Sequence, residues 1–582
     1  MTTRRPNQMA IGSLDQLPAE ILISIAAHLN RIHRSDLSSL ALTSRACHAA
    51  ATFYLFLDIR VRIKHPQKLR RDVDRWLEVL GRTNSARHVR RLEMTFEDKT
   101  LHHSDLYSPN RVYFMSSSFG TEALNERKNP QNRRLRDAFV NPDAWAPMVE
   151  LLVSLTGLTN LVVEHETSFS RHLVEALRDR HTECLLDLRH FDLHCIDGAA
   201  LDPHDISLIL SPQLQSISIK EYYQMIPGHI NEIAVLKLVN GLAPGLKMVN
   251  LEPAFGARHQ PNYNAELENQ LQALMAQVFQ QTRIHWRKAL EAVTTSNLGS
   301  LPSLSLQKTS PERLRAWSEA TDFAALRHLK LSVGTRELQY LSQCARFPCL
   351  DNLDLNLGGY GSIQQDTRRE ETLDSAAVEF LVALPALASL SLAGYLSSSV
   401  IDLAFLKHGA SLLRLKLRPM LHSRWPGDGM GLTPQHVDSL PSTCPLLEDL
   451  TIKIAVSEPG WNLTEICESI GQNRRLRALY LTIDETIFTS TLLGRFRRAR
   501  ERDRISQPLP DMMDEYVATS AWDTICEQGC RLELMHLDAL HQRAGVRKSE
   551  RVYQIRRVGA IGEGMVAETL CRCNGRLLKI RE

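Results

Sequence analysis

Long apolar runs are missing from this chain of 582 residues. No stretch of about eighteen apolar residues occurs, so the sequence predicts no membrane-spanning helix. The N-terminal residues MTTRRPNQMAIGS carry two arginines without an apolar segment behind them, which argues against a secretory signal. We therefore expect an intracellular protein, in the cytoplasm, the nucleus or both, that has no membrane partner.

Charge of one sign is also scarce, since the formal net charge is only +3. A dedicated nucleic-acid-binding protein would gather a clustered basic face, so we expect no nucleic-acid partner. The hydrophobic content of 43% and the charged content of 23% are typical of globular proteins. A chain this long favours two or more structural units.

The familiar motifs of catalysis and cofactor binding are absent. The sequence contains no G-x-G-x-x-G, Walker loop, G-x-S-x-G or H-E-x-x-H. Its eleven cysteines are scattered, and without a secretory signal they favour a reduced compartment. Cys526 and Cys530 have His536 and His541 nearby, but the paired spacing of a zinc site is missing. We predict no catalytic residues, no metal site and no cofactor.

Residues 14–57 form the most informative segment. Pro18 suits the first turn of a helix. Ser35 and Asp36 can cap a second short helix, and Ser44 can cap a third. Helices this short need packing partners. Apolar residues recur along the segment at helical spacing: Leu17, Ile21, Leu22, Ile25, Ala26, Leu29, Leu37 and Leu40.

The order of residues in this segment resembles an F-box, the three-helix unit of cullin-type ubiquitin ligases. The residues that carry the resemblance are Leu17, Pro18, Glu20, Ile21, Leu22, Ile25, Leu29, Asp36, Leu37, Leu40, Leu42, Ser44 and Arg45. Two departures are a slightly long linker at 30–35 and the residues Thr43 and Ala46. The resemblance implies a Skp-family adaptor, and through it a cullin, as partners. It implies an adaptor-binding set of Leu17, Pro18, Ile21, Leu22, Ile25, Leu29, Leu37 and Leu40.

The rest of the chain repeats the pattern Leu-x-x-Leu-x-Leu. Clear copies begin at Leu326, Leu350, Leu387, Leu412, Leu447 and Leu476, and weaker ones at Val89, Leu158, Leu188, Leu214, Leu246 and Leu532. The last two apolar residues of a copy are two apart, so they point to one side of a short strand. Helical apolar stripes lie between the copies. Such helix–strand units bury their apolar faces only by stacking, and the distances between clear copies straddle the usual length of leucine-rich repeats.

The pattern predicts an α/β fold, with an N-terminal three-helix F-box followed by an irregular leucine-rich-repeat solenoid of short parallel strands and outer helices. A doubly wound α/β domain is the alternative, but it would need a glycine fingerprint after its first strand. The predicted segments are a disordered N-terminus (1–13), the F-box (14–57), a connecting helix and first repeat (58–100), a polar insertion or loop (101–135), the repeat domain (136–545) and a C-terminal cap or tail (546–582). A long helix is predicted over 264–296 and a charged helical run over 495–504.

Strand positions between the leucines should face the opposite side of the sheet. There the charge alternates between strands, so neighbours can partly neutralise each other. A phosphate receptor would instead gather its arginines in one pocket. The candidates for contact with a protein target are Arg327, Lys330, Arg414, Lys416 and Arg418.

These observations predict a substrate receptor of a cullin-RING (SCF-type) ubiquitin ligase, an adaptor without an active site of its own. The alternative is a non-catalytic leucine-rich-repeat scaffold whose F-box-like helices are only a cap. A cap would bury Leu17, Pro18, Ile21 and Leu22 against the first repeat, whereas an adaptor site would leave them as an open apolar patch.

Overall fold

The chain divides into two compact units, residues 1–297 and 298–582, in the computed structural model. The boundary between them lies inside the range predicted as one repeat domain. The predicted segments 1–13, 101–135, 264–296 and 495–504 lie outside the described residues. The structure describes residues 14–96, 142–253, 298–484 and 520–579, apart from gaps within these ranges, of which the longer are 165–169, 190–207, 222–234, 359–366, 420–430, 456–462 and 558–566.

The first unit opens with a short 3-10 helix, η1 (Leu14–Gln16), and three α-helices. These are α1 (Ala19–Ile32), α2 (Arg34–Ala41) and α3 (Arg45–Phe56). The predicted cap of α3 is confirmed, because the Cys47 N–H donates to Ser44 Oγ at 3.2 Å. The predicted cap of α2 is wrong: that helix already begins before Ser35 and Asp36.

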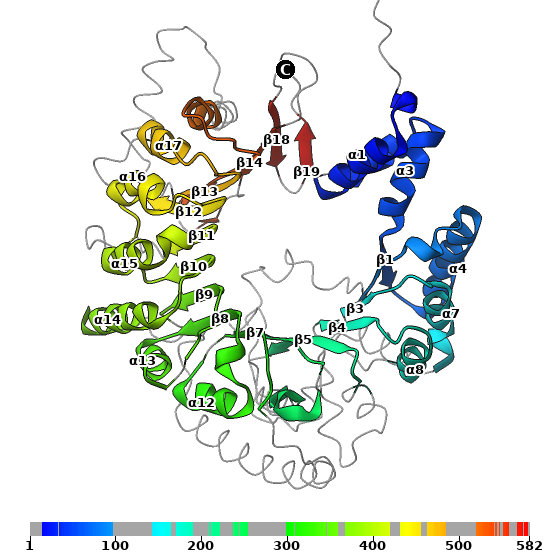
Figure 1. Cartoon of the computed structure of the whole chain (residues 1–582), viewed down its shortest axis with the longest axis horizontal. Coiled ribbons are helices and arrows are strands. Elements are labelled where there is room, and N and C mark those ends of the chain that lie inside the picture. The colour runs from blue at the N-terminus through cyan, green and yellow to red at the C-terminus, as the bar shows by residue number, and fades with distance from the viewer. Residues whose placement is uncertain are drawn as a thin grey trace, which may run out of the picture. The chain divides into compact units, whose positions relative to one another are not determined.

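A parallel sheet follows in the first unit, and each of its strands pairs with the next along the chain. The strands are β1 (Asp58–Ile63), β2 (Arg91–Phe96), β3 (Asn160–Glu164), β4 (Leu185–Arg189), β5 (Leu214–Glu221) and β6 (Met248–Pro253). The helices between them lie along one face of the sheet (Figure 1): α4 (Pro66–Thr83), α7 (Ala146–Ser154) and α8 (Arg171–Arg180).

The second unit has a longer parallel sheet in which consecutive strands are again neighbours. The strands are β7 (Ser303–Leu306), β8 (His328–Val333), β9 (Asn352–Leu357), β10 (Ser389–Gly394), β11 (Arg414–Pro419), β12 (Asp449–Ala455), β13 (Ala478–Asp484) and β14 (Leu534–Leu540). Its helices also follow one face of the sheet (Figure 1): α12 (Pro311–Ala320), α13 (Thr335–Cys344), α14 (Thr367–Ala383), α15 (Ser398–His408), α16 (Pro434–Thr443) and α17 (Leu463–Gly471).

The second unit ends with antiparallel strands. Strand β14 pairs with β17 (Arg551–Arg557), which is followed by β18 (Ala567–Cys573) and β19 (Arg576–Lys579). A separate two-stranded pair is formed by β15 (Gln542–Arg543) and β16 (Val546–Arg547). The change from parallel to antiparallel pairing ends the repeating strand–helix pattern.

The order of the strands distinguishes this fold from a doubly wound one. A doubly wound sheet reverses its strand order and carries helices on both faces. Here each parallel strand neighbours the next one along the chain within each unit, and the labelled helices lie on one face. The structure is therefore α/β and solenoid-like, with each strand–helix unit packed on its neighbours.

The leucine pattern sets which face of the second sheet is buried. Register places Leu329, Leu353, Leu390, Leu415 and Leu450 side by side on five successive strands, and each is at most 3% exposed. Alternation along a strand turns every second residue to the same face, so the copies of the pattern form continuous rows of leucine. The predicted inward orientation of these residues is confirmed.

Two details of the pattern differ from expectation. The weak copy beginning at Leu188 is wrong, because β4 spans Leu185–Arg189 and buries Leu186 together with Leu188. Strand β7 had no predicted copy, although Leu301, Leu304 and Leu306 have the same spacing and are buried.

Candidate functional site

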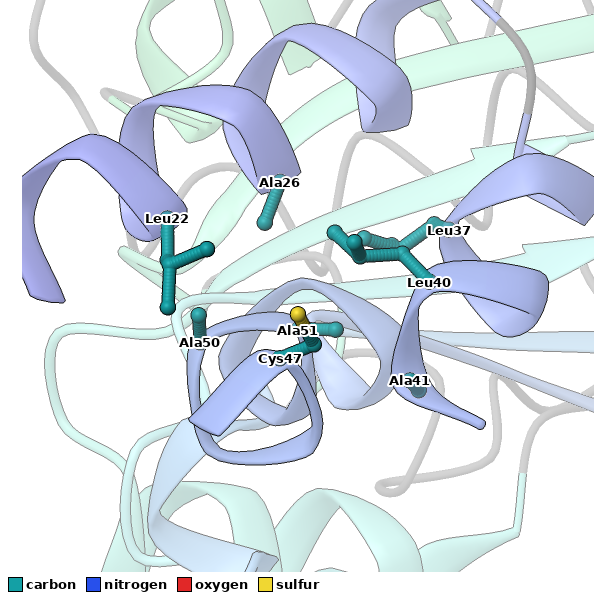
Figure 2. Packing of buried hydrophobic residues seen from close by; sticks show 8 residues of the cluster. All are labelled: Leu22, Ala26, Leu37, Leu40, Ala41, Cys47, Ala50 and Ala51. Atoms are coloured by element: carbon teal, nitrogen blue, oxygen red, sulfur yellow. The ribbon is translucent and has the colours of Figure 1, made fainter. Parts of the chain in front are cut away.

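The three N-terminal helices enclose a small apolar core. Its buried residues point toward one another in Figure 2: Leu22, Ala26, Leu37, Leu40, Ala41, Cys47, Ala50 and Ala51. Leu22, Leu37 and Leu40 were predicted to contact an adaptor, and the structure instead buries them between the helices. They can support such a surface only by holding the helices together.

Other residues of the predicted set lie on the outside. Leu17 is 39% exposed and Ile21 is 47% exposed, and Pro18 between them is also exposed. Leu14, which sequence reasoning did not include, is 46% exposed. We call Leu14, Leu17, Pro18 and Ile21 the apolar strip.

Helical hydrogen bonds hold the apolar strip in one line. The Leu17 N–H donates to the Leu14 carbonyl at 3.1 Å, and the Ile21 N–H donates to the Pro18 carbonyl at 3.0 Å. Leu14 lies in η1 and Ile21 in the first turn of α1, and Leu17 and Pro18 join the two helices, so the apolar strip follows the entry of the chain into α1. Exposed apolar groups that lie together in this way are typical of contact sites for proteins.

The predicted residues Ile25 and Leu29 lie between these two groups. Both are partly buried and pack against the core of the three helices. Two further apolar side chains are exposed in this segment, Ile23 of α1 at 46% and Leu42 in the turn between α2 and α3 at 87%. Ile23 is two positions from Ile21 and so leaves α1 on a different side.

The three helices continue directly into the first strand of the sheet. Only Leu57 separates α3 from β1, and its carbonyl accepts hydrogen bonds from the backbone N–H groups of Arg90 and Arg91 at 2.9 and 3.0 Å. The ring of Phe53 on α3 lies edge-to-face with His88 at 5.6 Å. These contacts tie the helices to β1 and β2 while Leu17, Pro18 and Ile21 stay exposed.

The second candidate surface is the face of the second-unit sheet opposite its leucines. Register makes Lys330, Asp354, Ser391 and Lys416 neighbours on β8 to β11. The predicted target-binding residue Arg327 is not in this row, because it precedes β8 and its carbonyl accepts from the backbone of β9. Of the predicted set, the structure therefore brings Lys330 and the three cations of β11 onto one face.

Strand β11 concentrates positive charge on this face. Arg414 and Arg418 are exposed and Lys416 is half-buried between them. The Arg414 Nη2 donates to Asn352 Oδ1 at 3.2 Å. Asp449 lies beside Arg414 in register, and burial raises the pKa of its carboxyl while Lys416 and Arg414 oppose that change.

A serine, a histidine and an aspartate also meet in the second unit, which sequence reasoning missed. His436 Nε2 lies 3.1 Å from Asp402 Oδ1 and 3.2 Å from Ser398 Oγ. Its Nδ1 accepts from the Thr433 N–H at 2.9 Å, so the ring proton is on Nε2. A nucleophilic serine needs an unprotonated nitrogen beside it. This histidine instead completes the capping box that begins α16.

The remaining motifs that fall on described residues lead to no site. Cys530 is buried, and its Sγ donates to the Leu476 carbonyl at 3.3 Å, which explains it as part of the packed sheet. Within the described ranges, no group of three His, Cys, Asp or Glu side chains is placed to hold a metal ion. None of the helices in those ranges is long and apolar enough to cross a membrane.

Comparison with known proteins gives no relative: no family model and no curated protein matches this chain. Two surfaces bear on the function: the apolar strip at the entry to α1 and the cations on β11.

Proposed function

We propose that this protein is the substrate-recognition subunit of a cullin-RING (SCF-type) ubiquitin ligase. The observation that carries the proposal is the exposure of Leu17, Pro18 and Ile21. These residues stand where the F-box-like order implies contact with a Skp-family adaptor, and each keeps an apolar side chain in water. Removing apolar surface from water contributes roughly 25 cal/mol per Å², so covering the strip would stabilise a complex.

In this proposal the three helices are an F-box and the strand–helix units are leucine-rich repeats. Leu22, Leu37 and Leu40 hold the helices together, and the apolar strip meets the adaptor. The open face of the second-unit sheet holds the target protein. The chain then supplies proximity and orientation inside the cell and leaves the covalent chemistry to its partners.

A leucine-rich scaffold with a helical cap is the second candidate. The direct passage of α3 into β1 favours it, because Leu57 joins the hydrogen bonds of the sheet and Phe53 contacts His88. A cap, however, would cover its apolar residues with the first repeat. The exposure of the strip supports the adaptor function over the cap.

Calorimetric titration of the full chain with a purified Skp-family adaptor tests the proposal. We expect micromolar or tighter binding. The variant Leu17→Ala/Pro18→Ala/Ile21→Ala should bind at least about tenfold more weakly, because a few apolar anchors dominate such interfaces. The strip is exposed, so this variant should stay folded.

The matched control truncates exposed apolar residues of the first unit outside the three helices. Val153, Leu185 and Met248 are 40%, 37% and 42% exposed, and their joint replacement by Ala should leave adaptor binding unchanged. Absence of binding by the folded wild type would contradict the ligase proposal. Equal losses in the two variants would contradict the role of the strip.

A further inference from the structure

One strand of the second unit gathers positive charge that forms no ion pair among the residues that the structure describes. Arg414, Lys416 and Arg418 alternate along β11, and none of them forms an ion pair with a residue that the structure describes. The first unit differs, since Arg60 of β1 lies opposite Glu93 of β2 and pairs with it at 3.0 Å. The cations of β11 therefore keep their charge for a partner.

The neighbouring strand β10 presents only short side chains on this face. Ser389, Ser391 and Ala393 lie in register with the three cations of β11. Neighbouring strands are about 4.8 Å apart, so the longer side chains of β11 can reach over β10. Arg414 already does so, because it donates to Asn352 on β9, beyond Ser389.

The spacing of the cations matches that of an extended peptide. Alternate residues of a strand are about 6.6–7 Å apart, and the same distance separates alternate side chains of any extended chain. A peptide lying along β10 with an acidic residue at every second position would therefore place one carboxylate near each of Arg414, Lys416 and Arg418. Hydrogen bonds between such charged groups are stronger than those between neutral ones.

Two carboxylates on the same face cancel only part of this charge. Asp354 of β9 lies opposite Lys330 of β8, which can balance it. Asp449 of β12 lies opposite Arg414 and can balance one cation of β11. Positive charge remains in excess along β11.

We propose that β10 and β11 bind an extended acidic segment of a partner protein, with acidic residues at alternate positions opposite Arg414, Lys416 and Arg418. The identity of this partner as a degradation target rests on the proposed ligase function. The binding itself depends only on the charge and spacing of the strand.

Fluorescence anisotropy with the full chain and a labelled peptide of alternating glutamate and serine tests this inference. We expect binding that weakens as salt is added, because exposed charges are screened. The variant Arg414→Glu/Lys416→Glu/Arg418→Glu should bind at least about tenfold more weakly. A peptide of the same composition with its glutamates in one block should bind several-fold more weakly, since only half of its carboxylates can face β11.

The matched control is Arg336→Glu/Lys407→Glu/Arg475→Glu. It changes the net charge equally at exposed positions outside the strands, on α13, on α15 and before β13, and should keep peptide binding. Equal loss in both variants, equal binding of the two peptides, or binding of a single-stranded oligonucleotide but not of the alternating peptide would overturn the inference. Peptide binding without adaptor binding would refute the ligase proposal alone, and adaptor binding without peptide binding would refute this inference alone.

Discussion

The core of the three N-terminal helices and the leucine rows of the second unit differ in the size of their buried side chains. Of the eight buried residues in the helical core, five are alanine or cysteine. The rows of the sheet consist of leucines such as Leu390, Leu415 and Leu450, each 0% exposed. A buried leucine removes more apolar surface from water than an alanine does.

The two regions differ in where large apolar side chains remain exposed. The helices bury small side chains and leave larger ones, Leu17 and Ile21, in water. The sheet buries its large side chains and leaves polar and charged ones outside. We therefore expect the helical segment to be less stable than the sheet, and the following measurements test that difference.

The largest effect is expected from Leu415→Ala in the leucine rows. Leu415 is 0% exposed between Leu390 and Leu450, so its truncation should lower the free energy of unfolding of the second unit by about 2–5 kcal/mol. Urea titration followed by circular dichroism measures it. Leu406→Ala is the control, because Leu406 is 85% exposed and should change the value by less than about 0.5 kcal/mol. Similar losses of stability in the two variants would contradict the role of the leucine rows.

A somewhat smaller effect is expected from Leu37→Ala in the helical core. The change should destabilise the three helices by about 2–3 kcal/mol and leave the unfolding of the second unit nearly unchanged. Limited proteolysis should then cut within residues 14–57 faster than in the wild type. The control is Leu42→Ala, since Leu42 is 87% exposed. Loss of both units together would show that the helices and the sheet unfold as one.

A smaller loss of stability is expected when the pH is lowered, and it should arise in the second unit from His408. His408 of α15 is fully buried, and burial lowers its pKa although the carbonyls of Leu381 and Pro385 oppose the change. The unfolded chain therefore protonates this histidine more readily than the folded chain does. The contribution of neutral His408 to stability is fully present above pH 6.5, the ordinary pKa of histidine, and is lost as the pH falls below it.

Urea midpoints of the second unit at pH 7 and pH 5 measure this loss. The wild type should lose more stability than His408→Leu, which has no group to protonate there. Equal losses in the wild type and the variant would contradict the role of His408.

The smallest effect concerns thiol reactivity and needs no mutation. Burial raises the pKa of Cys467 on α17 to about 12, so it should resist iodoacetamide, whereas the exposed Cys349 should react at once. Cys47 in the helical core is equally buried, but a small core opens more readily. Peptide mass spectrometry should show Cys47 labelled before Cys467. The reverse order would mean that the helices are the more stable region.

Much of the fold could be predicted because the strands and helices follow from the periodicity of apolar residues close in sequence. The Leu-x-x-Leu-x-Leu spacing located most of the strands, and the helical stripe at 376–384 located α14, because alternation in strands and the turn of a helix depend on residues close in sequence. The same periodicity predicted three short helices at the N-terminus. The start of β4 was missed because the pattern placed Leu188 before a strand, whereas Leu188 lies inside β4.

The candidate site was predicted less well, and the reason is physical. An apolar stripe on a helix is wider than one partner can cover, so spacing alone could not decide that Leu22 faces the core while Leu17 and Ile21 face water. The packing of α1 on α2 and α3 decided it.

Sequence by itself determined the alternation of helices and strands, the spacing of the leucines within each strand and the three cations on β11, since each depends on neighbours within a few residues. Only the tertiary structure decided which strands lie side by side, and hence that Lys416 lies beside Ser391, that Arg414 reaches Asn352 and that Arg327 lies outside the row. Those relations depend on hydrogen bonds between segments far apart along the chain, and no local pattern encodes them.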